Sequence, residues 1–214
     1  MKSIVLDKVI PIPLHDNILN KDSVWGKECT IDAGDQCLVC APSGTGKTTL
    51  VSSIYGLRTD YTGTVKFDNE NTQSFSLAKW ALIRQQFLSV VFQDLLLFPQ
   101  LTAFENILIK HRLQPIKTEE EIKDMVKRLG IGDKLGKKCG LLSLGQQQRV
   151  AIVRALVQPF SFLLMDEPFS HIDENNIQLA SALIQEECSK NKAALVITSL
   201  SRNSYFPYTS SISV

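Results

Sequence analysis

The sequence predicts an α/β fold with a mainly parallel sheet, an antiparallel β edge and an inserted helical lobe. Short apolar runs alternate with helical stretches near both ends of the chain, which is the pattern of parallel strands joined by helices. Residues 95–150 differ, because they are mostly helical and include an amphipathic stretch over 119–129. We therefore expect one domain over 1–214, with a core formed by 1–94 and 151–214 and a helical subdomain over 95–150.

The first expected elements lead into a glycine-rich turn. Residues 3–9 and 24–32 alternate partly between apolar and polar side chains, which suits half-buried strands. Residues 36–40, QCLVC, form a short apolar run between a Gly-Asp turn and a proline, so we expect a buried strand there. The turn SGTGK follows, and a helix is expected over 48–55, ending at a glycine.

The remaining elements continue the alternation of strands and helices. Apolar runs predict further strands over 63–67, 88–92, 162–165 and 194–198. Helical periodicity predicts helices over 77–84, 119–129 and 175–189.

Composition excludes several classes of protein. The chain has 214 residues, of which 44% are hydrophobic and 21% charged, so it can bury a core and is not a disordered chain. Its net charge of +1 gives no reason to expect nucleic acid as a partner. No apolar run approaches the roughly 18 residues of a transmembrane helix. The five cysteines lack a disulfide framework, which fits a reducing cytoplasm, and we interpret the CxxC of Cys37 and Cys40 as buried strand cysteines.

Residues 41–48, APSGTGKT, fit the P-loop pattern, with Ala41 at the first glycine position. The alternative is a glycine-rich turn before an ordinary helix, but the position between a buried strand and a helix favours a phosphate cradle. Lys47 is expected to reach the β and γ phosphates, and the Thr48 hydroxyl to bind Mg²⁺. The sequence therefore predicts a P-loop NTPase core. Its expected nucleotide-binding residues are Ala41, Pro42, Ser43, Gly44, Thr45, Gly46, Lys47, Thr48 and Thr49.

Residues 162–168, FLLMDEP, place two carboxylates directly after a buried strand. Ligands of parallel sheets bind at the carboxyl ends of the strands. Asp166 is expected to bind Mg²⁺, and Glu167 to polarise the attacking water. An exposed loop after a strand is the alternative, since acids are common there, and the P-loop upstream favours the functional interpretation.

Three further motifs accompany these two. Gln93 ends a strand in SVVFQD, LSLGQQQR spans 142–149, and SHID spans 170–173. Together the five motifs resemble the nucleotide-binding subunits of ABC transporters, and the resemblance covers essentially the whole chain. The LSLGQQQR segment, at its distance before FLLMDEP, is highly specific to that family. The stretch LLLFPQLTAFENI after Gln93 is similar to the ATPase subunits of lipoprotein-release and macrolide-export systems.

The resemblance implies an ABC ATPase fold and a mechanism. Two nucleotide-binding domains, identical or different, would face each other head to tail, with each ATP between one P-loop and the partner's signature segment. The chain would hydrolyse ATP to ADP and phosphate and drive a separate membrane permease. It would then be cytoplasmic and peripheral on the inner face of the cell membrane.

The resemblance also implies roles for single residues. The residues that would meet the partner's ATP are Ser143, Gly145 and Gln146. The implied metal ligands are Thr48, Gln93 and Asp166, and the implied catalytic residues are Glu167, Gln93 and Ser199. Asp173 would lie at the dimer seam, and it also suits a helix N-cap.

Two positions depart from the family pattern. Leu144 replaces the first glycine of the signature, so its side chain must find room near the partner and the backbone loses freedom. Ser199 stands where the family has a histidine that contacts the γ-phosphate. These departures leave a slow or non-hydrolysing ATP-gated subunit as an alternative to an ordinary transporter ATPase. A soluble ABC ATPase without a membrane partner is a separate alternative.

The family's adenine-stacking aromatic has no counterpart around Ile18 and Leu19. Ile18 offers a weaker apolar contact, His15 is a candidate, and Trp25 is too close to the P-loop. In the segment DLLLFPQL, the apolar run 95–98 is too long for one short loop to bury. We expect some of these side chains to be exposed and to contact the membrane partner.

Overall fold

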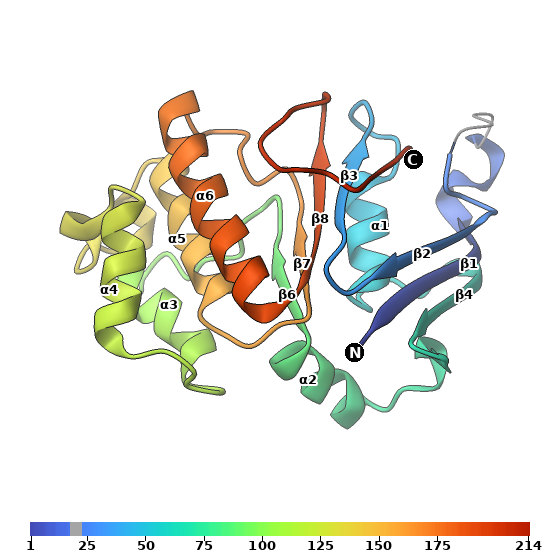
Figure 1. Ribbon diagram of the computed structural model, residues 1–214, viewed down its shortest axis with the longest axis horizontal. Helices are drawn as coiled ribbons and strands as arrows, with labels where there is room; N and C mark the ends of the chain where they lie inside the picture. The colour runs from blue at the N-terminus through green and yellow to red at the C-terminus, as the bar shows by residue number, and fades with distance from the viewer. Residues whose placement is uncertain (18–22) are drawn as a thin grey trace.

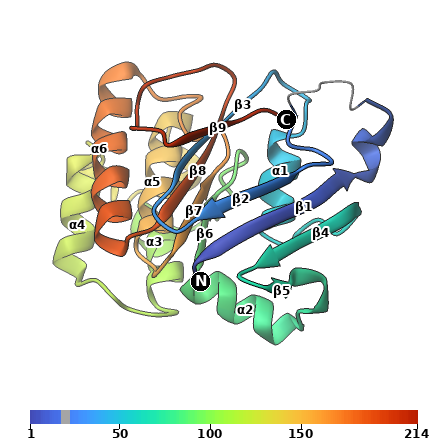
Figure 2. The same ribbon diagram turned by 45° about the vertical axis from the view of Figure 1, so that its right-hand side comes forward.

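The computed structural model describes residues 1–17 and 23–214 and arranges them in layers (Figure 1). An antiparallel sheet lies at one side and a group of helices at the other, with a parallel sheet between them. The helix α1 (Lys47–Ile54) lies between the two sheets, as the turned view shows (Figure 2). The predicted α/β architecture with its parallel sheet, antiparallel strands and helical lobe is therefore confirmed.

The antiparallel strands form a separate sheet of order β2-β1-β4-β5. These strands are β1 (Ser3–Pro11), β2 (Glu28–Asp32), β4 (Tyr61–Phe67) and β5 (Glu70–Asn71). The strand expected over 24–32 was predicted too long. Gly26 adopts a left-handed φ of 75°, and its N–H donates to the Val9 carbonyl, so the chain turns before β2 begins.

The parallel sheet has the order β6-β7-β8-β3-β9, and all of its pairs are parallel. Its strands are β6 (Leu88–Val91), β7 (Phe162–Met165), β8 (Ala194–Ser199), β3 (Gln36–Cys40) and β9 (Ser210–Ile212). The short edge strand β9 was not predicted. Because the strands are parallel, the segments that follow β3, β6, β7 and β8 meet at one edge of the sheet.

The helices cover the face of the parallel sheet that is turned away from α1 (Figure 1). They are α3 (Ala103–His111), α4 (Glu119–Arg128), α5 (Leu144–Leu156) and α6 (Glu174–Asn191), while α2 (Leu77–Gln86) precedes β6. Short 3-10 turns cover Ile12–Asn17, Thr72–Ser74, Gly132–Lys134 and Cys139–Leu141. The helix α5 crosses the boundary expected at residue 150.

Alternation along the buried strands divides the core in two. Along β7, Phe162 and Leu164 pack with α1 and the antiparallel sheet, whereas Leu163 and Met165 pack with α3 to α6. The helical lobe therefore shares its hydrophobic core with one face of the parallel sheet. Among the described residues, no helix has both the length and the apolar character required to cross a bilayer.

Candidate active site

The P-loop joins β3 to α1 at the carboxyl edge of the parallel sheet. Gly44 and Gly46 have φ values of 81° and 112°, a region that side chains disfavour. A Cβ atom on Gly46 would also lie 2.8 Å from the Leu14 Cδ1 atom. Glycine is therefore required at the residue that precedes α1, and the helix presents its N–H groups to the loop.

Lys47 is the centre of the polar contacts in this loop. Its ammonium group donates hydrogen bonds to the carbonyls of Ala41 and Pro42, both at 2.7 Å. The same Nζ atom lies 3.2 Å from Glu167 Oε1, and both side chains are largely buried. The structure thus brings together the lysine after β3 and the second carboxylate after β7, which are far apart in the sequence.

A pocket of about 160 Å³ opens beside Lys47. Thr48 donates to Gln93 Oε1 at 3.4 Å across this pocket. The described residues that line it are Leu14, Ser43, Gly44, Gly46, Lys47, Thr48, Thr49, Gln93 and Glu167. Most of the predicted own-chain nucleotide-binding residues therefore surround one cavity. Leu14 also lines it, although no sequence pattern had pointed to this residue.

The Asp166 side chain is buried at the end of β7. Its Oδ1 atom accepts a hydrogen bond from Thr198 Oγ1 at 2.7 Å. Its Oδ2 atom is buried and has no hydrogen-bond partner in the described part of the chain. An unpartnered carboxylate oxygen suits a hydrated cation, and the Thr48 hydroxyl and Gln93 amide supply further oxygens, so these residues fit Mg²⁺. No cluster of three or more His, Cys, Asp or Glu capable of holding a metal occurs among the described residues.

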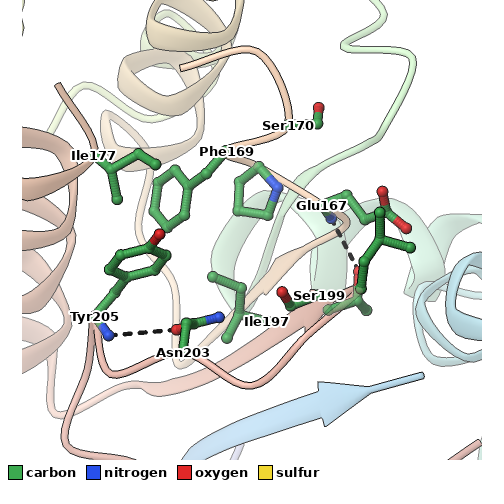
Figure 3. Close-up of a pocket in the computed structure, with 11 residues that line it drawn as sticks. Glu167, Phe169, Ser170, Ile177, Ile197, Ser199, Asn203 and Tyr205 are labelled. Carbon is green, nitrogen blue, oxygen red and sulfur yellow. Dashed lines mark hydrogen bonds between the residues drawn. The ribbon is translucent and has the colours of Figure 1, made fainter. Parts of the chain in front are cut away.

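Glu167 follows in a left-handed conformation, with a φ of 47°. Its backbone N–H donates to Thr198 Oγ1 at 2.9 Å, drawn as a dashed line in Figure 3. The residue borders a second cavity of about 150 Å³, whose apolar wall includes Phe169, Ile197 and Tyr205. Ser199, the last residue of β8, also lines this cavity (Figure 3).

The signature residues begin α5 and lie on the surface. Ser143 caps the helix in a capping box with Gln146, with contacts of 3.4 Å and 3.1 Å. Leu144 is the first helical residue and is not among the residues with a positive φ, so the leucine causes no backbone strain, and its side chain is 54% exposed. A Cβ atom on Gly145 would lie 2.4 Å from the His171 carbonyl oxygen, so that position requires glycine. No residue of α5 is among the described residues that line the Lys47 pocket.

Asp173 caps α6, because its side chain accepts a hydrogen bond from the Asn176 N–H at 3.1 Å. Hydrogen bonds from the Asn176 side chain and backbone hold the pKa of this carboxyl below its usual value. The adenine-side candidates Ile18 and Leu19 lie outside the described residues, as does the side chain of His15. Trp25 is buried and packs near Gly46, in agreement with its expected position beside the P-loop.

Two buried polar side chains were missed by the sequence analysis. Gln148 of α5 donates to Ser170 Oγ at 2.8 Å and to the Glu167 carbonyl at 3.5 Å. Thr198 bridges the two acidic residues. The sequence contained one signal for Thr198: it is a polar residue near the end of an apolar strand, at the sheet edge that also carries Asp166.

The loop after Gln93 divides its apolar run as expected. Leu95 is buried, while Leu96 and Phe98 are 56% and 53% exposed. The loop is fixed despite left-handed φ values at Leu95 and Leu96, because the Arg154 guanidinium donates to both of their carbonyls. Burial lowers the pKa of Arg154.

Comparison with known proteins identifies relatives of this arrangement. A family model described as ABC transporter matches residues 26–170. The lipoprotein-releasing system ATP-binding protein LolD of Shewanella frigidimarina is 33% identical over 86% of this chain and 78% of its own length. An uncharacterized ABC transporter ATP-binding protein of Mycobacterium tuberculosis is 32% identical over 83% of this chain, which spans only 54% of that relative's length.

Solved structures show the same fold. The dimeric bacterial ABC transporter cassette MJ0796 matches with a TM-score of 0.76 and 27% identity, covering 92% of this chain and 88% of the cassette. A post-hydrolysis dimer of that cassette bound to ADP and phosphate matches with a TM-score of 0.75 and 26% identity over the same shares.

Proposed function

Because the chain belongs to the ABC transporter ATP-binding family, we propose that it binds Mg-ATP in the Lys47 pocket and hydrolyses it to ADP and phosphate. The observation that carries this proposal is the meeting of Lys47, Glu167, Thr48 and Gln93 around one pocket. Such a set provides a cation for phosphate, a carboxylate for water and oxygens for a metal ion.

Each residue of the pocket has a distinct role in this proposal. Lys47 and the P-loop N–H groups bind and orient the phosphates. Glu167 orients the attacking water and accepts its proton. Thr48, Gln93 and Asp166 hold Mg²⁺, which supplies charge neutralisation at the phosphates.

A second nucleotide-binding domain completes the site. Ser143, Gly145 and Gln146 lie at the exposed N-terminus of α5, where backbone N–H groups favour an anion. Because no described residue of α5 lines the chain's own pocket, these groups serve the ATP of a partner chain. This arrangement implies that ATP joins two chains head to tail, and the dimeric form of the MJ0796 cassette supports it.

A membrane permease docks at the loop that follows Gln93. The exposed Leu96 and Phe98 side chains offer an apolar contact on a rigid backbone. Asn106 fixes Phe98 by accepting from its N–H at 2.8 Å and donating to its carbonyl at 3.0 Å. Through this contact the chain is held peripherally at the inner face of the cell membrane.

Turnover is slow relative to relatives that carry a histidine at position 199. Ser199 borders the same cavity as Glu167, but its short hydroxyl reaches less far than an imidazole ring. The missing contact is one donor to the γ-phosphate, which lowers the rate without preventing ATP binding.

The decisive experiment compares the wild-type chain with Glu167→Gln. Mg-ATP affinity is measured by calorimetry and turnover by phosphate release. The proposal predicts retained binding in both proteins, measurable turnover in the wild type, and turnover reduced ~10²-fold or more in the variant, the scale of a lost general base. Equal turnover in both proteins would show that Glu167 is not the general base.

A further inference from the structure

The two carboxylates at the end of β7 are joined by a single hydroxyl group. Thr198 lies on β8, one residue beyond the pairing of Met165 with Ile197, and its side chain is buried. It accepts a hydrogen bond from the Glu167 N–H at 2.9 Å and lies 2.7 Å from Asp166 Oδ1. Since a threonine hydroxyl has one proton, and the Glu167 N–H is the donor in the first contact, that proton goes to Asp166.

Glu167 needs such a support because of its backbone. A left-handed φ of 47° is unfavourable for a residue with a Cβ atom, and conformations of this kind persist where surrounding contacts hold them. The Asp166 N–H is fixed separately, because it donates to the Val91 carbonyl at 2.8 Å. Of the two peptide groups that flank Asp166, the first is therefore held by β6 and the second by the Thr198 hydroxyl.

We propose that Thr198 is a positioning residue for the reaction: its hydroxyl holds the left-handed Glu167 backbone and fixes the Asp166 carboxylate, whose second oxygen has no partner among the described residues. This inference rests on the proposed function, since it names a group that acts through Glu167 and Asp166. Thr198 lines the second cavity with Glu167 and Ser199, and its hydroxyl contacts Asp166 and Glu167, so we assign it a role through these two residues.

The test replaces Thr198 with valine, which keeps the branched shape and removes the hydroxyl, and with serine, which keeps the hydroxyl. We expect Thr198→Val to lower kcat ~10-fold or more, because small displacements of reacting groups have large effects on rate. The KM for ATP changes less than about threefold, since Lys47 and the P-loop are untouched. Thr198→Ser restores kcat to within about threefold of the wild type, because the two hydrogen bonds can form again.

A matched control separates positioning from stability. Thr72 is also buried, and its hydroxyl donates to the Val65 carbonyl at 3.0 Å, on the antiparallel sheet. Thr72→Val loses one buried hydrogen bond, so its melting temperature falls, but its kcat stays at the wild-type value. If Thr72→Val lowers kcat as much as Thr198→Val, or if serine fails as valine does, the positioning role is contradicted.

A second readout does not depend on turnover. Amide hydrogen exchange at Glu167, followed by NMR in the full chain, reports the hydrogen bond to Thr198 directly. Exchange should become faster in Thr198→Val and remain near wild type in Thr198→Ser. Unchanged protection in the valine variant overturns the inference, even with reduced kcat. If the wild-type chain does not hydrolyse ATP, the proposed function fails, while the exchange result still decides the role of Thr198.

Discussion

The P-loop half of the site and the signature half differ in how their polar groups are held. Lys47 contacts two carbonyls and Glu167 from its own chain, in a partly enclosed pocket. Within the residues that the structure describes, the Ser143 side chain accepts a hydrogen bond only from the first turn of its own helix, and the neighbouring Leu144 is 54% exposed. One half is supported by interactions within the chain, whereas the other presents a capped helix end to the surface.

The difference follows from the fold. The P-loop and the acidic pair come after strands of one parallel sheet, so their side chains converge without help from another molecule. The signature segment begins α5 in the helical lobe. The Gly145 backbone packs against the His171 carbonyl, and the outer side of this helix end is left uncovered. Under the proposed function, the first half binds ATP within one chain, and the second acts only against another chain.

The largest effect is expected from breaking the P-loop half. Lys47→Ala removes a charged donor to the phosphates, a contact worth about 1.5–3 kcal/mol, so Mg-ATP affinity should fall about tenfold to a hundredfold. Calorimetry measures the loss. Lys123→Ala, at an exposed helical ion pair with Glu119, is the control and should bind ATP like the wild type. Unchanged affinity in Lys47→Ala would defeat the P-loop assignment.

Breaking the signature half should leave ATP binding intact. Ser143→Arg adds bulk and charge at the exposed end of α5, so turnover should fall at least tenfold while the affinity of the single chain changes less than about twofold. Ser143→Ala removes the hydroxyl and with it the cap, which costs about 1 kcal/mol of stability, but adds no bulk, so it separates loss of the serine from obstruction. A large loss of ATP affinity in Ser143→Arg would show that Ser143 contributes to the chain's own pocket, which contradicts the division of the site into two halves.

The apolar loop after Gln93 is a third surface, distinct from the P-loop and from the start of α5. Leu96→Ser with Phe98→Ser should keep the melting temperature and ATP affinity, because both side chains are exposed, yet reduce permease binding in a pull-down with membrane fractions. The matched control is Leu77→Ser with Leu82→Ser on α2, where both leucines are also exposed. If both double variants retain permease binding, docking occurs elsewhere. A large drop in melting temperature for the first would show a packing role.

A smaller effect is expected at position 199. Ser199→His introduces the side chain that the family resemblance implies at this position, and should raise kcat a few-fold. A preorganised donor to developing charge can contribute roughly 2–4 kcal/mol, but Ser199 is not among the described residues that line the Lys47 pocket, so the gain should be smaller. Steady-state phosphate release measures it. If the folded variant binds ATP but shows no increase in kcat, Ser199 is not the cause of slow turnover.

Much of this arrangement was predictable from the sequence. The buried strand before SGTGK and the apolar run before Asp166 predict parallel strands whose ends meet, and Lys47 and Glu167 do lie 3.2 Å apart. The contacts of Thr198 and Gln148 were not predictable, because their partners are far away in the sequence and come close only in the folded structure. The sequence also could not show how the chain accommodates Leu144, which is the first residue of α5, a helical position that tolerates a side chain.

The central claim is that ATP joins two chains through their unequal halves, and the most direct test is the molecular mass of the Glu167→Gln variant in solution. Size-exclusion chromatography with light scattering compares the variant in Mg-ATP and in Mg-ADP. The account predicts a dimer in Mg-ATP, a monomer in Mg-ADP, and no dimer in either nucleotide when Ser143→Arg is added. A variant that binds Mg-ATP yet stays monomeric, or a dimer that Ser143→Arg leaves intact, would contradict it.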